Sequence, residues 1–239
     1  MKTNKREDMY TNGEYLANNP KWDSSDAAWK SDQIFKILKK NNLIDKNIIS
    51  EVGCGSGEIL FNISKKFPKD TEYFGYDISP QAIEIANENK EKHKNKNNFK
   101  FELLSIPDVK ADILICADVF EHVSDEFNFL VNIKETGEYK VFNIPLDLSV
   151  QSIIRESTIM AQRKRVGHIN YYTKGLALET LKDTGYEIVD VTYGIWYKHY
   201  PVESIMTRLV NILRNILMLI NSDLCVKWLG GSSLIVLTK

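Results

Sequence analysis

A glycine-rich turn is the first stretch of the sequence whose residue types and spacing could do chemistry. It reads EVGCGSG over residues 51–57, between a short β-branched run and a new apolar period. Glycine is needed where the backbone takes conformations closed to residues with a Cβ, and where a ligand lies against the main chain. The helix that follows points its free N–H groups at that ligand. The turn therefore predicts a nucleotide-type site made by Glu51, Gly53, Cys54, Gly55 and Gly57.

The side chains around this turn narrow the choice of ligand. A dinucleotide fingerprint has glycine at the first, third and sixth positions of the turn, so that a pyrophosphate can sit on the helix N-terminus. Here the sixth position is Glu58, and its negative charge argues against NAD or FAD. Glu51, just before the first glycine, suits a ligand with a cationic end, such as the ammonium group of an amino acid. A turn that only packs a helix on a strand is the alternative.

A second acid lies at a spacing that suits a ribose. Residues 71–77 predict a strand that ends in Asp77, and Ile78 follows it. An acid at the end of the second parallel strand sits beside the glycine turn, where it can accept both hydroxyl groups of a ribose. The alternative is a carboxylate in water, because strand ends often carry polar residues.

The turn and Asp77 together resemble motif I and the ribose-binding acid of the class I S-adenosylmethionine-dependent methyltransferases. The resemblance implies S-adenosylmethionine as cofactor. It also implies an α/β fold, a Rossmann-like doubly wound sheet of seven strands, mostly parallel with the last strand antiparallel, with helices on both faces. An acid after the third strand commonly reads the adenine amine in that family, but this chain has Ser105 and Ile106 there. These two residues complete the expected cofactor site together with Ile78, Ala117 and Asp118.

The sequence after the predicted fourth strand, 112–118, points to the methyl acceptor. It continues as VFEHV, at the end of a strand whose carboxyl edge forms the ligand crevice of such folds. This EHV resembles the small-molecule branch of the family, which includes quinone and many natural-product methyltransferases, and it places Glu121 and His122 near the acceptor. Nucleic-acid amino methyltransferases carry Asn or Asp followed by Pro-Pro-aromatic at this point. That motif is missing, and the similar NIP at 143–145 follows the fifth strand.

Two histidines are the candidate catalytic bases. His168 belongs to a Gly-His followed by aromatics at 167–172, which also resembles these methyltransferases. Transfer from a sulfonium needs mainly binding and orientation, but an oxygen or nitrogen acceptor can also need a base. His168 and His122 titrate in the useful range, and a hydrogen bond to a loop is the alternative for either. Asp118 and Asp147 could converge on a metal ion, which stays open, but no metal-ligand spacing is evident and no metal ligand is assigned.

Further acceptor contacts are expected from the first helix and from a substrate-side connection at 146–170. The connection carries basic residues at 155 and 163–165, which could hold a phosphate or a sugar nucleotide or simply form a solvated helix face. Trp29 could line the substrate entrance or pack against the core. The candidate substrate-binding residues are Trp29, Glu121, His122, Arg163, His168 and Tyr171.

The elements that must position these residues belong to one domain. Residues 1–22 are polar, with interspersed aromatics, and predict an N-terminal arm that folds over the ligand. Residues 23–239 form the methyltransferase domain, which opens with a helix capped at Ser24 or Ser25. A helical insertion at 199–230 contains an apolar stretch, 202–220, that is too short and too interrupted to span a membrane. We expect it to cap the acceptor site or to pair in a homodimer, with a membrane surface as a further alternative.

Composition excludes some classes of partner. The chain has 239 residues, with 31 basic and 32 acidic residues and a formal net charge of −1. This balance gives no global attraction to nucleic acid or to an anionic membrane. The three cysteines, Cys54, Cys116 and Cys225, are widely separated and indicate reduced thiols. No secretory signal is visible at the start, so the expected location is the cytoplasm.

The sequence therefore predicts an enzyme that transfers a methyl group from S-adenosylmethionine to an oxygen or nitrogen of a small molecule. The family resemblance suggests a sugar, a nucleotide sugar or a phosphate derivative from bacterial surface-polysaccharide synthesis. Two alternatives stay open. One is a non-catalytic S-adenosylmethionine-binding partner subunit, and the other is a nucleotide-sugar or dinucleotide enzyme, to which the missing sixth-position glycine is the objection.

Overall fold

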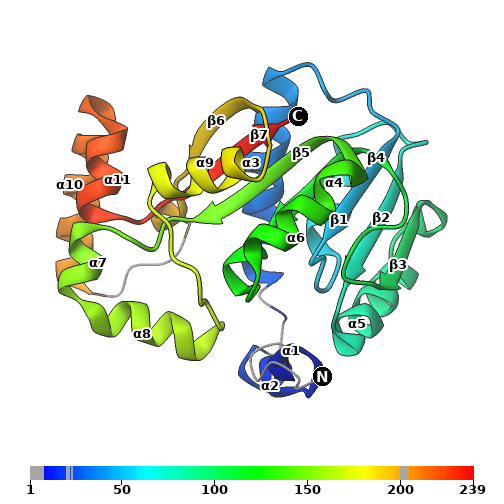
Figure 1. Ribbon diagram of the computed structural model, residues 1–239, viewed down its shortest axis with the longest axis horizontal. Helices are drawn as coiled ribbons and strands as arrows, with labels where there is room; N and C mark the ends of the chain where they lie inside the picture. The colour runs from blue at the N-terminus through cyan, green and yellow to red at the C-terminus, as the bar shows by residue number, and fades with distance from the viewer. Residues whose placement is uncertain (1–7, 20–21, 23, 200–203) are drawn as a thin grey trace.

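A single seven-stranded sheet forms the centre of the computed structural model, which describes residues 8–19, 22, 24–199 and 204–239 (Figure 1). The strand order is β3-β2-β1-β4-β5-β7-β6. Strands β1 to β5 pair in parallel, and β7 lies antiparallel between β5 and β6. The strands are β1 Ile48–Val52, β2 Glu72–Asp77, β3 Phe99–Leu103, β4 Ala111–Ala117, β5 Gly137–Pro145, β6 Ile188–Gly194 and β7 Ser233–Thr238. This confirms the predicted doubly wound sheet with an antiparallel last strand.

Two hydrophobic cores lie on opposite faces of the sheet, and β4 contributes to both. Ile113 and Ile115 point to the face covered by α3, α4 and α5, whereas Leu114 and Cys116 point to the face covered by α6 and α9. All four side chains are fully buried. Successive side chains of a strand point to opposite faces, so a strand covered on both sides reads as an unbroken apolar run. This explains why every residue of 113–117 in β4 is apolar.

The helices fall into those that cover the sheet and those that lie beyond its edges. The covering helices are α3 Ala27–Lys40, α4 Glu58–Ser64, α5 Pro80–Glu91, α6 Glu126–Ile133 and α9 Lys174–Asp183. The others are α1 Asp8–Thr11, α2 Glu14–Asn18, α7 Val150–Ile154, α8 Glu156–Arg165, α10 Ile205–Ile220 and α11 Ser222–Leu229. Figure 1 shows α7, α8, α10 and α11 gathered at one end of the molecule, and α1 and α2 below the sheet.

Local capping sets where several helices begin. Ser79 caps α5 by accepting from the Ala82 N–H, with Pro80 in the first turn, as the sequence predicts. Thr173 caps α9 in the same way. The first helix differs from the prediction, because Ser24 and Ser25 belong to a short 3₁₀ turn and α3 has Asp26 at its N-cap, without a side-chain cap bond. We show below that the Asp26 carboxylate is used elsewhere.

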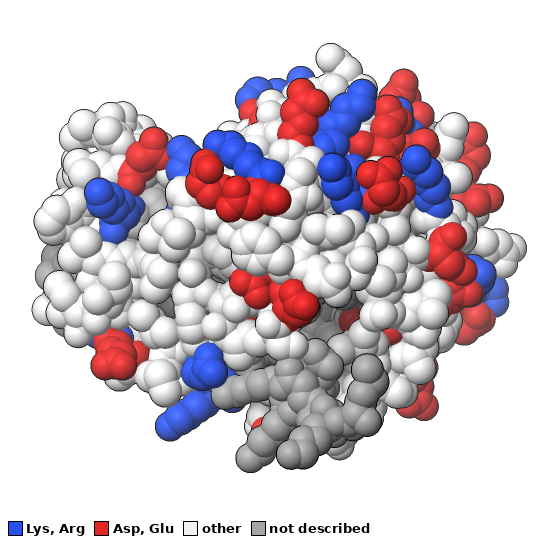
Figure 2. Space-filling model, in the orientation of Figure 1, with Lys and Arg blue, Asp and Glu red and all other residues white. Residues whose placement is uncertain are grey.

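The predicted arm and insertion both appear as helices within the described residues. Residues 8–19 of the arm form α1 and α2, while residues 1–7 and 20–21 lie outside the described part of the chain. The insertion forms α10 and α11, and its residues 200–203 are likewise not described. None of the helices in the described ranges has the length and hydropathy needed to cross a bilayer. In Figure 2, charges of both signs alternate over the upper part of the face shown, and the end formed by α10 and α11 is mostly uncharged.

Candidate active site

A cavity of about 730 Å³ opens at the carboxyl ends of β1, β2, β4 and β5. This is the edge at which ligands bind in open α/β sheets, beside the point where the strand order reverses. The predicted site residues that line the cavity are Trp29, Glu51, Gly53, Cys54, Gly55, Asp77, Ile78, Ser105, Ala117, Asp118, His122 and His168. The cavity thus joins most of the expected cofactor site to both candidate bases.

The glycine turn takes a backbone conformation that requires glycine. Gly53, Gly55 and Gly57 have φ angles of 69°, 52° and 77°, in the left-handed region that residues with a Cβ rarely adopt. A Cβ at Gly55 would lie 2.5 Å from Cδ1 of Trp22, so the indole packs directly against the turn. The Cys54 N–H donates to the Tyr76 carbonyl at 3.0 Å, which holds the turn beside β2.

Asp77 joins the glycine turn to the start of α5. One carboxylate oxygen accepts from the Gly55 N–H at 2.9 Å, and the other accepts from the Ser79 N–H at 2.8 Å. Burial raises the pKa of Asp77, and these N–H bonds partly oppose that rise. Each carboxylate oxygen has a second lone pair, so Asp77 can still accept ribose hydroxyl groups. Its position therefore fits the adenosine part of the cofactor.

Glu51 fits the cationic end of the cofactor. Its side chain lies at the end of β1, lines the cavity and is only 1% exposed, and its Oε2 has no hydrogen-bond partner among the described residues. Burial raises the pKa of Glu51 well above its usual range, although the Lys30 charge opposes that rise. A buried carboxylate without a partner is costly, and a bound ammonium group would supply one. The chemistry of Glu51, Asp77 and the glycine turn thus suits a ligand that combines a ribose with a cationic end.

We expect cofactor binding to release a proton from Glu51. Below its raised pKa the free carboxyl is neutral, and pairing with an ammonium group requires the ionised form, so affinity should rise with pH until that pKa is passed. Calorimetric titration with S-adenosylmethionine in two buffers of different ionisation enthalpy measures this proton. Glu51→Gln should remove the proton release and lower the affinity by about 1.5–3 kcal/mol. Unchanged proton release in Glu51→Gln would assign it to another group, such as Asp77.

Asp118 is held by a lysine that the sequence analysis did not identify. The Lys30 ammonium lies 2.6 Å from Asp118 Oδ2 and 3.0 Å from Asp26 Oδ1. Burial disfavours the charge on Lys30, but the two carboxylates outweigh it and raise the pKa of Lys30 above its usual range. Asp118 itself has a φ of 55°, and its other oxygen accepts from the Asn143 amide. A non-glycine residue in this region is a strained position of the kind that clusters at functional sites.

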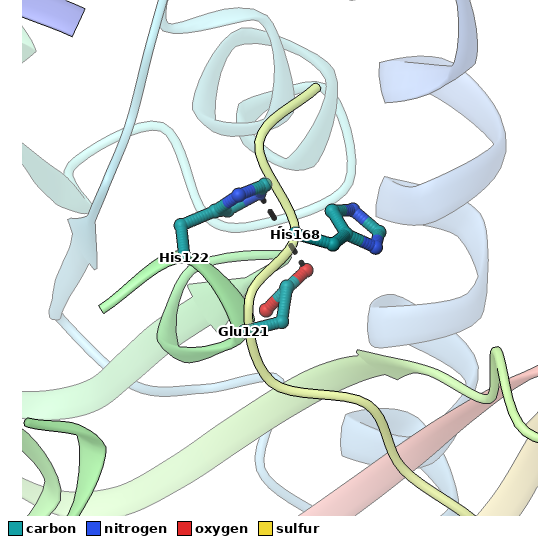
Figure 3. A group of neighbouring side chains, drawn as sticks. All are labelled: Glu121, His122 and His168. Carbon is teal, nitrogen blue, oxygen red and sulfur yellow. Dashed lines mark ion pairs between the residues drawn. The ribbon is translucent and has the colours of Figure 1, made fainter. Parts of the chain in front are cut away.

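The two candidate bases lie next to each other in the wall of the cavity. Their rings are 4.8 Å apart between centroids, in an edge-to-face arrangement. His168 Nδ1 lies 2.6 Å from Asp147 Oδ2, and His122 Nδ1 lies 2.9 Å from the Tyr10 hydroxyl. Burial, together with the neighbouring His168, lowers the pKa of His122 to about 3. Figure 3 shows the His122 ring facing the Glu121 carboxylate, with the His168 ring beside them.

Five predicted residues are not among the described lining residues of the cavity. Arg163 and Tyr171 both donate to the His168 carbonyl, at 3.4 and 2.9 Å, and so position the loop that carries His168. Gly57 is the N-cap of α4, where a Cβ would meet Phe101. Glu121 is fully buried, and Ile106 is 39% exposed.

Several lining residues were missed because their signals were weak in the sequence. The arm contributes Tyr10 and Tyr15 to the lining. Helix α8 contributes Arg165, whereas the sequence analysis selected Arg163, two residues earlier. Lys30 had the clearest signal. It lies on the buried stripe of α3, between Ala27 and Ile34, and a charge on a buried stripe needs a partner.

Comparison with known proteins agrees with this geometry. The sheet order and the acids at the ends of β1 and β2 define a Rossmann-like protein that binds an adenosine-type cofactor. A family model described as a methyltransferase domain matches residues 45–183. The chain therefore belongs to the methyltransferase-domain family, and its fold is that of the class I S-adenosylmethionine-dependent methyltransferases.

Individual relatives are more distant. A release factor glutamine methyltransferase of Dictyoglomus turgidum is 40% identical over 87 residues, which cover 34% of this chain and 30% of that protein. The magnesium protoporphyrin IX methyltransferase of Synechocystis PCC 6803, solved with bound S-adenosylmethionine, has a TM-score of 0.57 at 12% identity and covers 88% of this chain and 78% of its own. The complex between the Haloferax volcanii Trm112 methyltransferase activator and a methyltransferase contains a chain with a TM-score of 0.61 at 13% identity. The match covers 95% of this chain and 94% of that chain. At these identities, the solved structures show the fold.

Proposed function

We propose that this protein transfers a methyl group from S-adenosylmethionine to an oxygen or nitrogen of a small-molecule acceptor. The observation that carries the proposal is the His168–Asp147 pair, which lies in the same cavity as Glu51 and Asp77. A histidine oriented by a carboxylate is a common form of general base. The cavity thus combines a cofactor site with a base for the acceptor.

The chain's own residues bind, orient and shield the reactants. The bound cofactor supplies a methyl group on an activated sulfonium leaving group. Tyr15 and Trp22 cover the cavity from the N-terminal arm, residues 1–22, and help to exclude water. The His168 Nδ1–H donates to Asp147, which leaves the Nε2 lone pair available for the acceptor's proton.

The lining of the acceptor end supports a sugar, a nucleotide sugar or a sugar phosphate as substrate, as in surface-polysaccharide synthesis. Arg165 and Gln162 reach the cavity from α8, within the substrate-side connection 146–170, and the guanidinium group suits a phosphate. Trp29 and Trp196 also line the cavity, and their rings offer flat apolar surfaces to a sugar. Such a substrate and three buried free cysteines support a cytoplasmic location.

A calorimetric titration with S-adenosylhomocysteine, with NAD as comparison, is the first test. We expect micromolar binding of S-adenosylhomocysteine and none of NAD. Formation of S-adenosylhomocysteine from S-adenosylmethionine is then followed with sugar phosphates and nucleotide sugars as acceptors. Binding of NAD alone would support the dinucleotide alternative. Cofactor binding without turnover, on acceptors of every class, would support a non-catalytic partner subunit.

We also propose that the protein forms a homodimer through α10, within the predicted 202–220 stretch, of which residues 202–203 are not described. The usual placement of polar and apolar side chains is reversed in this helix, because an arginine is buried and apolar side chains are exposed. Its Arg214 faces inward and donates to the Leu229 carbonyl and to Asn211, while an apolar stripe faces outward. The stripe consists of Ile205, Leu209, Ile212, Ile216 and Leu219, between 51% and 90% exposed.

The spacing of this stripe favours a second copy of the helix as its partner. Its residues are alternately four and three positions apart, the repeat with which two helices pack along a seam. Residues 204–220 contain no acidic residue and only two arginines, of which Arg214 is buried. With a net charge of −1, the chain has no general attraction to an anionic membrane. A two-fold pairing of α10 would bury the stripe on both copies.

Leu209→Glu should convert the dimer to a monomer. A carboxylate at the centre of the seam would have to be desolvated without a partner, which costs several kcal/mol, about the scale of a weak interface. Sedimentation equilibrium at micromolar concentration measures the mass. Leu176→Glu is the matched control, because Leu176 is similarly exposed, at 54% against 56%, but lies on α9. A monomeric wild-type chain, or a dimer that survives Leu209→Glu, would contradict this interface.

A further inference from the structure

Glu121, His122 and His168 form a cluster of potential metal ligands beside the acceptor end of the cavity. One ligand atom from each lies within 4.8 Å of the others. Glu121 Oε1 is 3.9 Å from His122 Nε2, and Figure 3 shows this pair with the His168 ring beside it. Neither Glu121 oxygen has a hydrogen-bond partner among the described residues, although the side chain is fully buried. A buried carboxylate of this kind needs a partner.

Nδ1 of each histidine has a hydrogen-bond partner outside the cluster. The Tyr10 hydroxyl donates its single proton to the Val166 carbonyl at 2.8 Å, so it accepts from the His122 Nδ1–H at 2.9 Å. The His168 Nδ1–H donates to Asp147 at 2.6 Å. Metal-bound histidines almost always donate their other N–H to such an outer partner, which fixes the tautomer and the ring orientation. Both rings already have this arrangement.

The backbone holds the two ligand-bearing segments together. The Ile169 and Asn170 N–H groups both donate to the Glu121 carbonyl, at 2.9 and 3.0 Å. The Asn170 side chain donates to the carbonyls of Phe120 and Val123, at 3.0 and 2.8 Å. The loop after β4 is thus tied on both sides to the loop that carries His168. Ligands on one ion at about 2.0–2.2 Å lie about 3–3.5 Å apart, so these ligand atoms, now within 4.8 Å of one another, have to move closer when an ion binds.

We propose that Glu121, His122 and His168 bind a divalent first-row transition ion of the zinc type, with an open position toward the acceptor. Two imidazoles and one carboxylate suit Zn²⁺ or Fe²⁺, whereas Mg²⁺ prefers oxygen ligands and retained water. The assignment of the open position rests on the proposed function. An ion there occupies the Nε2 lone pairs, so each histidine serves either as ligand or as base. With the ion bound, an acceptor hydroxyl that coordinates it is acidified directly.

Zinc binding can be measured without any methyl transfer. Protein freed of metal with a chelator is titrated with Zn²⁺ by calorimetry, and the visible absorption of added Co²⁺ reports the coordination. We expect one equivalent per chain. His122→Ala and His168→Ala should each lower the affinity at least about 100-fold, and Tyr10→Phe should lower it about 10–100-fold because it removes the outer partner. His93→Ala, a histidine outside the cluster, should bind as the wild type does, and circular dichroism checks that each variant is folded.

The outcome separates the metal site from the proposed function. A wild-type chain that takes up no zinc, or zinc affinity unaffected by His122→Ala and His168→Ala, overturns the metal site. S-adenosylhomocysteine is titrated into the same samples. If it binds while zinc does not, the methyltransferase proposal stands without a metal. If zinc binds as expected and S-adenosylhomocysteine does not, the metal site stands and the proposed function fails.

Discussion

Replacing Gly55 by valine is expected to abolish binding of S-adenosylmethionine and S-adenosylhomocysteine while the chain still folds. Gly55 has a φ of 52°, where a β-branched residue is strained by about 1–3 kcal/mol. That strain is smaller than the typical stability of a domain, about 5–15 kcal/mol. The branched side chain would enter the space between the turn and Trp22, where a Cβ alone meets the indole at 2.5 Å. We therefore expect at least about a 100-fold loss of affinity, or about 2.7 kcal/mol.

Calorimetry with S-adenosylhomocysteine measures this loss, and thermal unfolding shows whether the fold persists. Gly175→Ala is the matched control. Gly175 lies in α9, and a Cβ there would meet its nearest neighbour at an ordinary 4.0 Å. Alanine at this helical position should leave the affinity unchanged and raise stability slightly. If Gly55→Val binds the cofactor as tightly as the wild type, the glycine turn is only structural and the assignment of the cofactor site is wrong.

His168→Ala is expected to lower turnover by about 10²–10⁴-fold, the usual contribution of a positioned base. Cofactor affinity should change little, because His168 lies at the acceptor end and not beside Glu51 or Asp77. Asp147→Asn should also lower turnover. The asparagine amide can donate an N–H to His168 Nδ1, which favours the tautomer that carries its proton on Nε2 and so cannot accept one there. The measurements are the rate of S-adenosylhomocysteine formation and, separately, its binding constant.

A role of His168 in folding would show a different pattern. Equal losses of turnover and of cofactor affinity, with lower thermal stability, would mean that His168 only holds the loop onto its neighbours. His93→Ala provides the baseline, because His93 stacks on Phe61 away from the cavity. Turnover of His93→Ala should match the wild type within the error of the assay.

The sheet could be predicted because local signals and global order agree along it. The unbroken apolar run at 113–117, the Ser79 cap and the glycine turn each determine their own element, and the parallel connections leave few arrangements. Long-range pairing of single side chains carries no such signal. Tyr10 reaches His122 across 112 residues, and Asp147 reaches His168 from another loop, so sequence could nominate the histidines but not their partners.

Charged residues inside the site show the same limit. The place of Lys30 on the buried stripe of α3 indicates that it needs a partner but not that the partner is Asp118. Asp26 looks like a helix cap until its carboxylate is found on Lys30. Which of Arg163 and Arg165 reaches the cavity depends on how α8 is rotated about its own axis. That rotation is set by tertiary packing, because α8 has no buried stripe of its own.

The two short helices at the start of the chain have a consequence for the speed of the enzyme. Tyr10 and Tyr15 line the cavity, and the Tyr10 hydroxyl is hydrogen-bonded to His122 and to the Val166 carbonyl. A spent cofactor is a nucleoside with an amino acid attached, and we expect it to leave only after this roof lifts. Lifting breaks the same bonds for every acceptor, so product release would set a common ceiling on turnover. Acceptors of very different reactivity would then share one maximal rate.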